Sequence, residues 1–130
     1  MNYEEMSNYE INKEVSKYWG VISKHLNLED TEITLNDENE TVYVMSENGV
    51  FEWLPVTYFD PCKNPNDAWP IIVDNNIEIT PNFNGMWTAS CIKVYTFEEE
   101  PVYDNDLCQS DKNPLRAAMI CFLKMKDAEK

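Results

Sequence analysis

The amino-acid sequence predicts an α+β fold: a single domain in which about three helices pack on a mainly antiparallel sheet. Three helix starts support the helices, namely a capping box from Ser7 to Glu10 and the pairs Asn64-Pro65 and Asn113-Pro114. Serine and asparagine cap free backbone N–H groups, and proline suits the first helical position. Segments rich in strand-forming residues lie between these starts as adjacent pairs, which favours antiparallel pairing.

The first predicted helix spans about residues 8–19 and begins at the capping box. Ile11 and Val15 recur at helical spacing, so we expect them to face the core. Gly20 follows at a position where glycine commonly ends a helix. The pattern therefore predicts one continuous helix that stops at Gly20.

The next segment predicts a hairpin. Residues 27–40 are acidic and polar, so we expect mainly a loop there, with a short strand around residues 33–35. Residues 41–45 and 50–54 are rich in strand formers, and Asn48-Gly49 between them supplies the positive φ angles of a tight turn. These two segments therefore read as the two strands of an antiparallel pair.

The second predicted helix lies near residues 65–74 and follows Asn64. Pro70 falls inside it, and an interior proline removes a backbone hydrogen bond and crowds the preceding turn. Two alternatives follow from this position. Either the helix kinks, or it begins later, at Asn66-Asp67, which places Pro70 in its first turn.

The remaining elements are a second pair of strands and a C-terminal helix. We expect strands over residues 77–80 and 86–96, and a helix over about residues 114–126 with its apolar residues on one stripe. Together with the first two helices, these elements predict one shared core. The residues expected to be buried in it are Ile11, Val15, Trp69, Ile72, Trp87, Ala118, Met119 and Phe122.

The net charge is −14, from 24 acidic and 10 basic side chains. A protein that binds nucleic acid directly needs a basic surface, so this class is not expected. The charge has two readings: a solvated surface that keeps the protein soluble, or an acidic face that competes for a basic, nucleic-acid-binding surface on another protein. The candidate partner-binding residues are Glu98, Glu99, Glu100, Tyr103, Asp104 and Asp106 in one acidic loop, and Asp37, Glu38 and Glu40 in a second.

The sequence offers little for catalysis or metal binding. Its four cysteines contain no Cys-x-x-Cys pair, and His25 is its single histidine, so the spacing does not suit a zinc site. No Gly-rich phosphate loop and no nucleophile elbow is present. We therefore expect no metal, no cofactor and no enzymatic activity. No stretch approaches the roughly 20 apolar residues of a membrane span, and a cytosolic protein is expected.

The polar residues at the two Asn-Pro helix starts form a second candidate site. Helix N-termini attract anions and hydrogen-bond acceptors. One reading is purely structural, with helix caps and an Asp–Arg bridge; the other is a polar pocket for a small, nucleotide-type ligand, walled by Trp69 and Trp87. The residues of this alternative are Asp60, Asn64, Asp67, Trp69, Asn113 and Arg116.

Two longer strings carry a family resemblance. They are Asp60-Pro-Cys-Lys-Asn-Pro-Asn-Asp-Ala-Trp-Pro-Ile-Ile and Asp111-Lys-Asn-Pro-Leu-Arg-Ala-Ala-Met-Ile. Both resemble the NinX family, small proteins encoded in the nin gene region of lambdoid bacteriophages. The resemblance also takes in residues 6–13 and 86–89, and so treats residues 1–130 as one NinX-like domain.

The resemblance implies a phage accessory protein that acts in the cytoplasm of an infected bacterium, and it implies no catalytic residues. Joined to the acidic charge, it predicts a protein that binds and inhibits or redirects a host protein, with anti-phage defence proteins among the candidates. The alternative is a protein that binds or sequesters a small ligand, and an enzyme of unrecognised type comes third. The sequence leaves the oligomeric state open.

Overall fold

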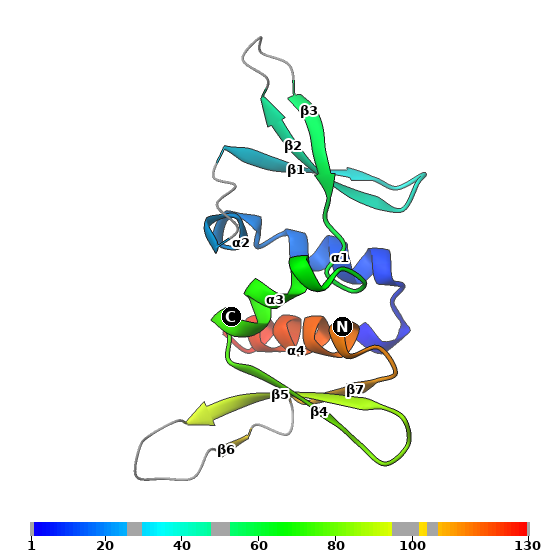
Figure 1. Cartoon of the computed structure of the whole chain (residues 1–130), viewed down its shortest axis with the longest axis vertical. Helices are drawn as coiled ribbons and strands as arrows, with labels where there is room; N and C mark the ends of the chain where they lie inside the picture. The colour runs from blue at the N-terminus through cyan, green and yellow to red at the C-terminus, as the bar shows by residue number, and fades with distance from the viewer. Residues whose placement is uncertain (1, 26–29, 48–52, 95–101, 104–106, 130) are drawn as a thin grey trace.

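Two small antiparallel sheets lie on opposite sides of a group of helices in the computed structural model (Figure 1). The predicted α+β class and antiparallel pairing are confirmed. The strands form two sheets where one was expected, and the described part of the chain holds four α-helices and a short 3-10 helix, η1 (Tyr3–Glu5). The structure describes residues 2–25, 30–47, 53–94, 102–103 and 107–129.

The N-terminal segment folds into two helices, α1 (Asn8–Ser16) and α2 (Trp19–His25). The predicted capping box is confirmed: Ser7 Oγ accepts from the Glu10 amide at 3.1 Å, and Glu10 Oε1 accepts from the Ser7 amide at 3.3 Å. The prediction of one helix that ends at Gly20 is wrong. Gly20 lies inside α2 and does not take the left-handed conformation of a glycine stop.

The break between α1 and α2 redirects the chain so that a second set of apolar side chains reaches the core. Trp19 and Ile22 are both buried. The Trp19 ring packs edge-on against Phe59, with ring centroids 5.2 Å apart. A single straight helix would not bring Trp19 to Phe59. Tertiary packing therefore overrides the local prediction of one helix that ends at Gly20.

The first sheet has the order β1-β2-β3, formed by β1 (Thr31–Asn36), β2 (Thr41–Glu47) and β3 (Trp53–Tyr58). It contains the predicted short strand and the first predicted hairpin strand. The second was predicted over residues 50–54, whereas β3 begins at Trp53 and continues through Pro55, which an edge strand tolerates. Residues 50–52 and the Asn48-Gly49 turn lie outside the described residues. Val42 and Val44 on β2 are buried, and α1 and α2 contact this side of the sheet. The sheet stands at one end of the molecule, at the top of Figure 1.

The helix α3 (Pro65–Asp74) decides between the two alternatives at Pro70. The Asn64 side chain accepts from the Asn66 amide at 3.0 Å, so Asn64 is the N-cap and Pro70 lies inside the helix. The helix does not begin at Asn66-Asp67. Its buried face consists of Ala68, Ile71 and Ile72.

The second sheet is built around β5 (Trp87–Val94). On one edge β5 pairs with β4 (Ile77–Pro81), and on the other with β6 (Val102–Tyr103) and β7 (Gln109–Asp111), all antiparallel. Both predicted strands are present, and residues 95–96 lie outside the described part.

The last helix, α4 (Pro114–Ala128), lies between the second sheet on one side and α1 and α3 on the other (Figure 1). Seven consecutive residues, 117–123, are buried. A helix that is buried on all sides needs no polar face. The prediction of one apolar stripe therefore understates its burial, and α4 is the centre of the core.

Six of the eight residues predicted to be buried are confirmed, and two are wrong. Trp69 is 62% exposed and Trp87 is 36% exposed. Trp69 follows the buried Ala68 on α3, and one helical step turns it off the core face. Trp87 is the first residue of β5, at the end of the strand, whereas Ala89 and Cys91 on the same face are covered. The confirmed residues are Ile11, Val15, Ile72, Ala118, Met119 and Phe122.

Candidate functional site

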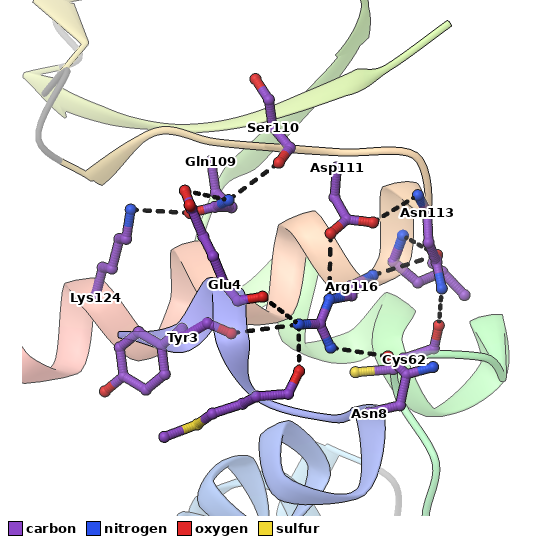
Figure 2. Close-up of polar contacts among 12 residues, drawn as sticks. Tyr3, Glu4, Asn8, Cys62, Gln109, Ser110, Asp111, Asn113, Arg116 and Lys124 are labelled. Carbon is purple, nitrogen blue, oxygen red and sulfur yellow. Dashed lines mark hydrogen bonds and ion pairs between the residues drawn. The ribbon is translucent and has the colours of Figure 1, made fainter. Parts of the chain in front are cut away.

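Arg116, on the first turn of α4, is the centre of a polar cluster (Figure 2). Its side chain is 11% exposed and pairs with Asp111, with Nε 3.1 Å from Oδ2. Nη1 donates to Asn8 Oδ1 at 2.9 Å, and Nη2 donates to the Met6 carbonyl at 2.5 Å. Longer bonds from Nη2 reach the carbonyls of Tyr3 and Glu4. An Asp–Arg bridge is therefore present, but its carboxylate is Asp111 and neither Asp60 nor Asp67 of the predicted set. The bonds to Asn8 and Met6 tie the N-terminal segment to α4. We call these residues the Arg116 cluster: Arg116, Asp111, Asn8 and the carbonyls of Tyr3, Glu4 and Met6.

Asn113 beside this cluster caps α4. Its Oδ1 accepts from the amides of Leu115 at 2.9 Å and Arg116 at 3.3 Å. Its Nδ2 donates to the Cys62 carbonyl at 2.6 Å, and its own amide donates to Asp111 at 2.9 Å. One side chain thus fixes both the start of α4 and the loop before α3.

The same loop is held from its other side. Asp60 Oδ1 accepts from Asn12 Nδ2 at 2.7 Å, and Asn12 Oδ1 accepts from the Cys62 amide at 3.2 Å. Asp67 accepts from the Asp60 amide at 2.9 Å, and its burial raises the pKa of its carboxyl. Asn64 caps α3. These bonds join α1 and α3 through one polar loop.

The structure thus brings most of the predicted ligand-binding residues together, but their polar atoms bond to the protein itself. A ligand at these helix starts would have to displace the cap of Asn113 or the bonds of Arg116. Trp69, which the ligand hypothesis places in the wall of the pocket, is an exposed side chain on α3. The arrangement supports the structural reading, with caps and an Asp–Arg bridge.

The second candidate region is the turn between β1 and β2. Asp37 Oδ1 accepts from the Tyr9 hydroxyl at 2.6 Å and from Lys13 Nζ at 3.3 Å. These two contacts lower the pKa of Asp37, with the Tyr9 bond the larger cause, and Tyr9 itself has its pKa raised to about 12 by burial and by Asp37. The turn is therefore anchored to α1 by two side chains.

Glu38 and Glu40 in the same turn are exposed, and neither carboxylate forms a hydrogen bond or salt bridge with any residue that the structure describes. Glu40 has a φ of 49°, the left-handed conformation that closes the turn. Asn39 donates its amide to Asn36 Oδ1 at 3.1 Å, which also shapes the turn. Asp37 thus holds the turn in place, while Glu38 and Glu40 face outward.

The first sheet turns a face away from the helices. Tyr43 and Met45 alternate with the buried Val42 and Val44, so their side chains lie on the opposite face. Tyr43 pairs with Tyr58 on β3, their ring centroids are 5.2 Å apart, and Tyr58 is 62% exposed. We define the outer face by three groups of residues: those on β2 and β3 just named, the residues of β1 on the same face, and the acidic residues of the β1–β2 turn. They are Tyr43, Met45 and Tyr58; Glu32, Thr34 and Asn36; and Asp37, Glu38 and Glu40.

The first sheet also lies in a segment of the chain that has no positively charged side chain. All ten Lys and Arg residues lie outside residues 26–62. That segment, which contains the whole first sheet, has nine carboxylates. Lys13 of α1 pairs with Asp37 at this sheet, but the excess of carboxylates in the segment still makes the first sheet a strongly acidic unit. The nine are Glu29, Asp30, Glu32, Asp37, Glu38, Glu40, Glu47, Glu52 and Asp60.

The other predicted acidic loop lies almost wholly outside the described residues. Of residues 98–106, the structure gives only the backbone of β6, where Tyr103 pairs with Ile92. The side chain of Tyr103 is not described. The positions that stay predictions are Glu98, Glu99, Glu100, Asp104 and Asp106.

The aromatic pair on the outer face was not predicted from the sequence. The signal was the alternation in β2, where Tyr43 stands between two valines and must point away from them. Tyr58 needs the register of β3, which a local pattern does not give.

Two further findings concern chemistry. Cys62, Cys91 and Cys121 are buried, and burial raises the pKa of Cys62 and Cys121 to about 12, so both are poor nucleophiles. Among the residues described, no three His, Cys, Asp or Glu side chains group so as to hold a metal ion. Nor does any helix within the described ranges have the length and apolarity that a membrane crossing requires.

Comparison with known proteins gives one match. The family model described as "Bacteriophage P22, NinX" matches residues 2–126. The match takes in both sheets, the Arg116 cluster and the outer face. No curated protein and no solved structure was found to match the chain.

Proposed function

This chain belongs to the NinX family of bacteriophage proteins and is a phage accessory protein of the nin region, and we propose that it binds a host protein through its acidic surface. In this proposal it inhibits or redirects that protein in the cytoplasm of the infected bacterium. Its action is binding and not catalysis. Host proteins of anti-phage defence are one class of target.

The observation that carries the proposal is the segregated charge of the first sheet. A stretch of 37 residues without one Lys or Arg, in a chain of net charge −14, gives a strong negative potential at one end of the molecule. Glu38 and Glu40 lie at that end with exposed carboxylates that form no salt bridge with any described residue. Carboxylates that are free of internal partners are available to a partner's cations.

The chemistry of the partner follows from the same charge. A basic surface that normally holds nucleic acid is complementary to this sheet, whereas nucleic acid itself is repelled. Exposed charges on the rim of an interface mainly raise the association rate, and salt screens them over about 8 Å at physiological ionic strength. Binding should therefore be fast at low salt and should weaken as salt is added.

The test is capture of a partner from bacterial lysate by the tagged protein at low and high salt, followed by association kinetics with the purified partner. The first variant carries Glu98→Lys, Glu99→Lys and Glu100→Lys, and the second carries Glu38→Lys and Glu40→Lys. The matched control carries Glu5→Lys and Glu129→Lys, two exposed carboxylates in η1 and after α4. The control changes net charge as much as the second variant does, but away from the first sheet.

We expect at least one of the two acidic-loop variants to associate more slowly and with a flatter salt dependence, while the control associates as the wild type does. The partner's own binding to nucleic acid should be blocked in the complex. If the partner binds equally well at high salt and to both loop variants, the acidic surface is only a solvated face and the proposal fails.

A further inference from the structure

We propose that the outer face of the first sheet is the docking surface itself and that its occupant is an arginine-bearing segment of a basic partner protein. This inference rests on the proposed function and makes it specific. It names one face among the acidic regions of the chain, and it names the side chain that the face recognises.

The first observation is that the described helices in contact with this sheet, α1 and α2, lie on its other face. That other face carries the buried Val42 and Val44. The outer face presents an aromatic pair, Tyr43 and Tyr58, in a chain segment that has no positive charge. Among the side chains that the structure describes, the other largely exposed aromatic residues, Trp69 on α3 and Phe83 after β4, lie on different elements.

The second observation is that two shallow hollows meet at Tyr43. One, of about 460 Å³, is lined by Tyr43 together with Asp37 and Glu38. The other, of about 360 Å³, is lined by Tyr43, Tyr58 and Glu40, and also by Asn12, Phe59 and Asp60, so it lies where the edge of the outer face meets α1. Each hollow therefore joins a tyrosine ring to a carboxylate.

A ring next to a carboxylate suits arginine. The guanidinium group is planar, so it stacks flat on an aromatic face and donates in a fork that matches a carboxylate. A lysine ammonium can also lie over a ring, as Lys13 does over Tyr9, but it is a point charge without a planar face or a donor fork. The charge also argues against a second copy of this chain as the occupant. Two chains of net charge −14 would bring their most acidic units together.

The third observation is that the face is held in place before any partner arrives. Asp37 is bound to Tyr9 and Lys13 on α1, as described above. Trp19 Nε1 donates to Thr31 Oγ1 at 3.2 Å at the other end of β1. A surface anchored at both ends loses little conformational entropy on binding.

The experiment uses the full chain and two labelled peptides of equal length, oligo-arginine and oligo-lysine, titrated at low salt. We expect the wild type to bind oligo-arginine more tightly. The double variant Tyr43→Ser/Tyr58→Ser should weaken oligo-arginine binding roughly 3- to 30-fold, which is the range of a cation–π contact, and should remove most of the preference over oligo-lysine. Glu32→Lys with Glu38→Lys should weaken the binding of both peptides.

Two controls separate the rings from general effects. Phe83→Ser with Trp69→Ser removes two exposed aromatic side chains elsewhere and should leave both affinities unchanged. Tyr43→Phe with Tyr58→Phe removes only the hydroxyl groups and keeps both rings, so it should keep the preference for oligo-arginine. A variant that had lost its fold would lose this preference. Amide shifts in nuclear magnetic resonance spectra of the wild type should be centred on β1, β2 and β3.

The outcomes distinguish this inference from the proposed function. If both peptides bind with salt dependence but bind equally well, or if the serine variant keeps the arginine preference, the outer face is not an arginine site. In that case the acidic surface still stands as the binding surface. If neither peptide binds at low salt, both the inference and the acidic-surface proposal fail.

Discussion

The Arg116 cluster and the outer face of the first sheet use polar side chains in opposite ways. Around Arg116 each donor meets an acceptor inside the protein, and the side chain is only 11% exposed. On the outer face, Glu38 and Glu40 form no such bond with the described residues, and Tyr58 is 62% exposed. The first arrangement holds chain segments together, and the second leaves carboxylates and an aromatic ring available for contact with another molecule.

The comparison teaches which polar residues of an acidic protein are candidates for function. Buried polar groups whose hydrogen bonds are all made inside the protein have a structural role, because a buried donor or acceptor without a partner would lower the free energy of unfolding. Within the described residues, no buried side-chain polar atom lacks a hydrogen-bond partner. Exposed carboxylates without an internal partner, such as Glu38 and Glu40 in the turn of the first sheet, are therefore the better candidates for the binding that we propose.

The largest expected effect is a core truncation in α4. Phe122 is 3% exposed, and its ring packs edge-on against Tyr18 with centroids 5.4 Å apart. Phe122→Ala should lower the free energy of unfolding by about 3–5 kcal/mol, measured by urea denaturation. An unchanged value would mean that α4 is not the centre of the core.

The next effect is expected at the Arg116 cluster. Arg116→Ala removes the donor to Asp111 Oδ2 and to the Met6 carbonyl, so the free energy of unfolding should fall by about 3 kcal/mol. Arg116→Lys keeps the charge but not the planar fork, and should recover only part of the loss. A fully stable alanine variant would show that the cluster is not structural and would reopen the ligand hypothesis.

A smaller effect is expected at the two caps. Asn113→Ala should cost about 1–2 kcal/mol and Asn64→Ala about 1 kcal/mol or less, because Asn113 also donates to the Cys62 carbonyl. Asn113→Asp keeps the cap oxygen and loses the donor, so it should fall between the wild type and the alanine variant. Equal losses at the two caps would contradict the double role of Asn113.

The smallest stability effect concerns pH at the exposed Asp37. Its contacts lower its pKa in the folded chain below the ordinary value of 3.8, so their contribution is present above that value and is lost as the pH falls through the lowered pKa. Asp37→Asn should therefore melt below the wild type near neutral pH, and the two should converge in acid. Tyr9→Phe, which removes the hydroxyl, should behave similarly. A difference that stays constant into acid would contradict the linkage.

Much of the fold was predictable from local signals. The capping box and both Asn-Pro starts are helix caps in the structure, and the paired strands are antiparallel. What failed depends on tertiary contacts. The chain breaks between α1 and α2 because Trp19 reaches Phe59, and Trp69 turns out of the core because its neighbours on α3 take the buried face.

The candidate site was predictable only in part. The turn with Asp37, Glu38 and Glu40 could be identified from composition, but composition does not separate Asp37, which is bonded to Tyr9, from its two neighbours. The bonds from Arg116 to Asn8 and Met6 and the pairing of Tyr43 with Tyr58 join segments that the local pattern leaves apart. Such contacts follow from register and topology, and the sequence pattern specifies neither.

The most direct test of the account is a paired measurement on Glu32→Lys/Glu38→Lys: the free energy of unfolding and the association rate with oligo-arginine. We predict that the free energy of unfolding does not fall by more than about 0.5 kcal/mol, because both carboxylates are exposed. The association rate should drop about tenfold at low salt. A variant that loses stability but associates as fast as the wild type would contradict the claim that this face serves a partner and not the fold.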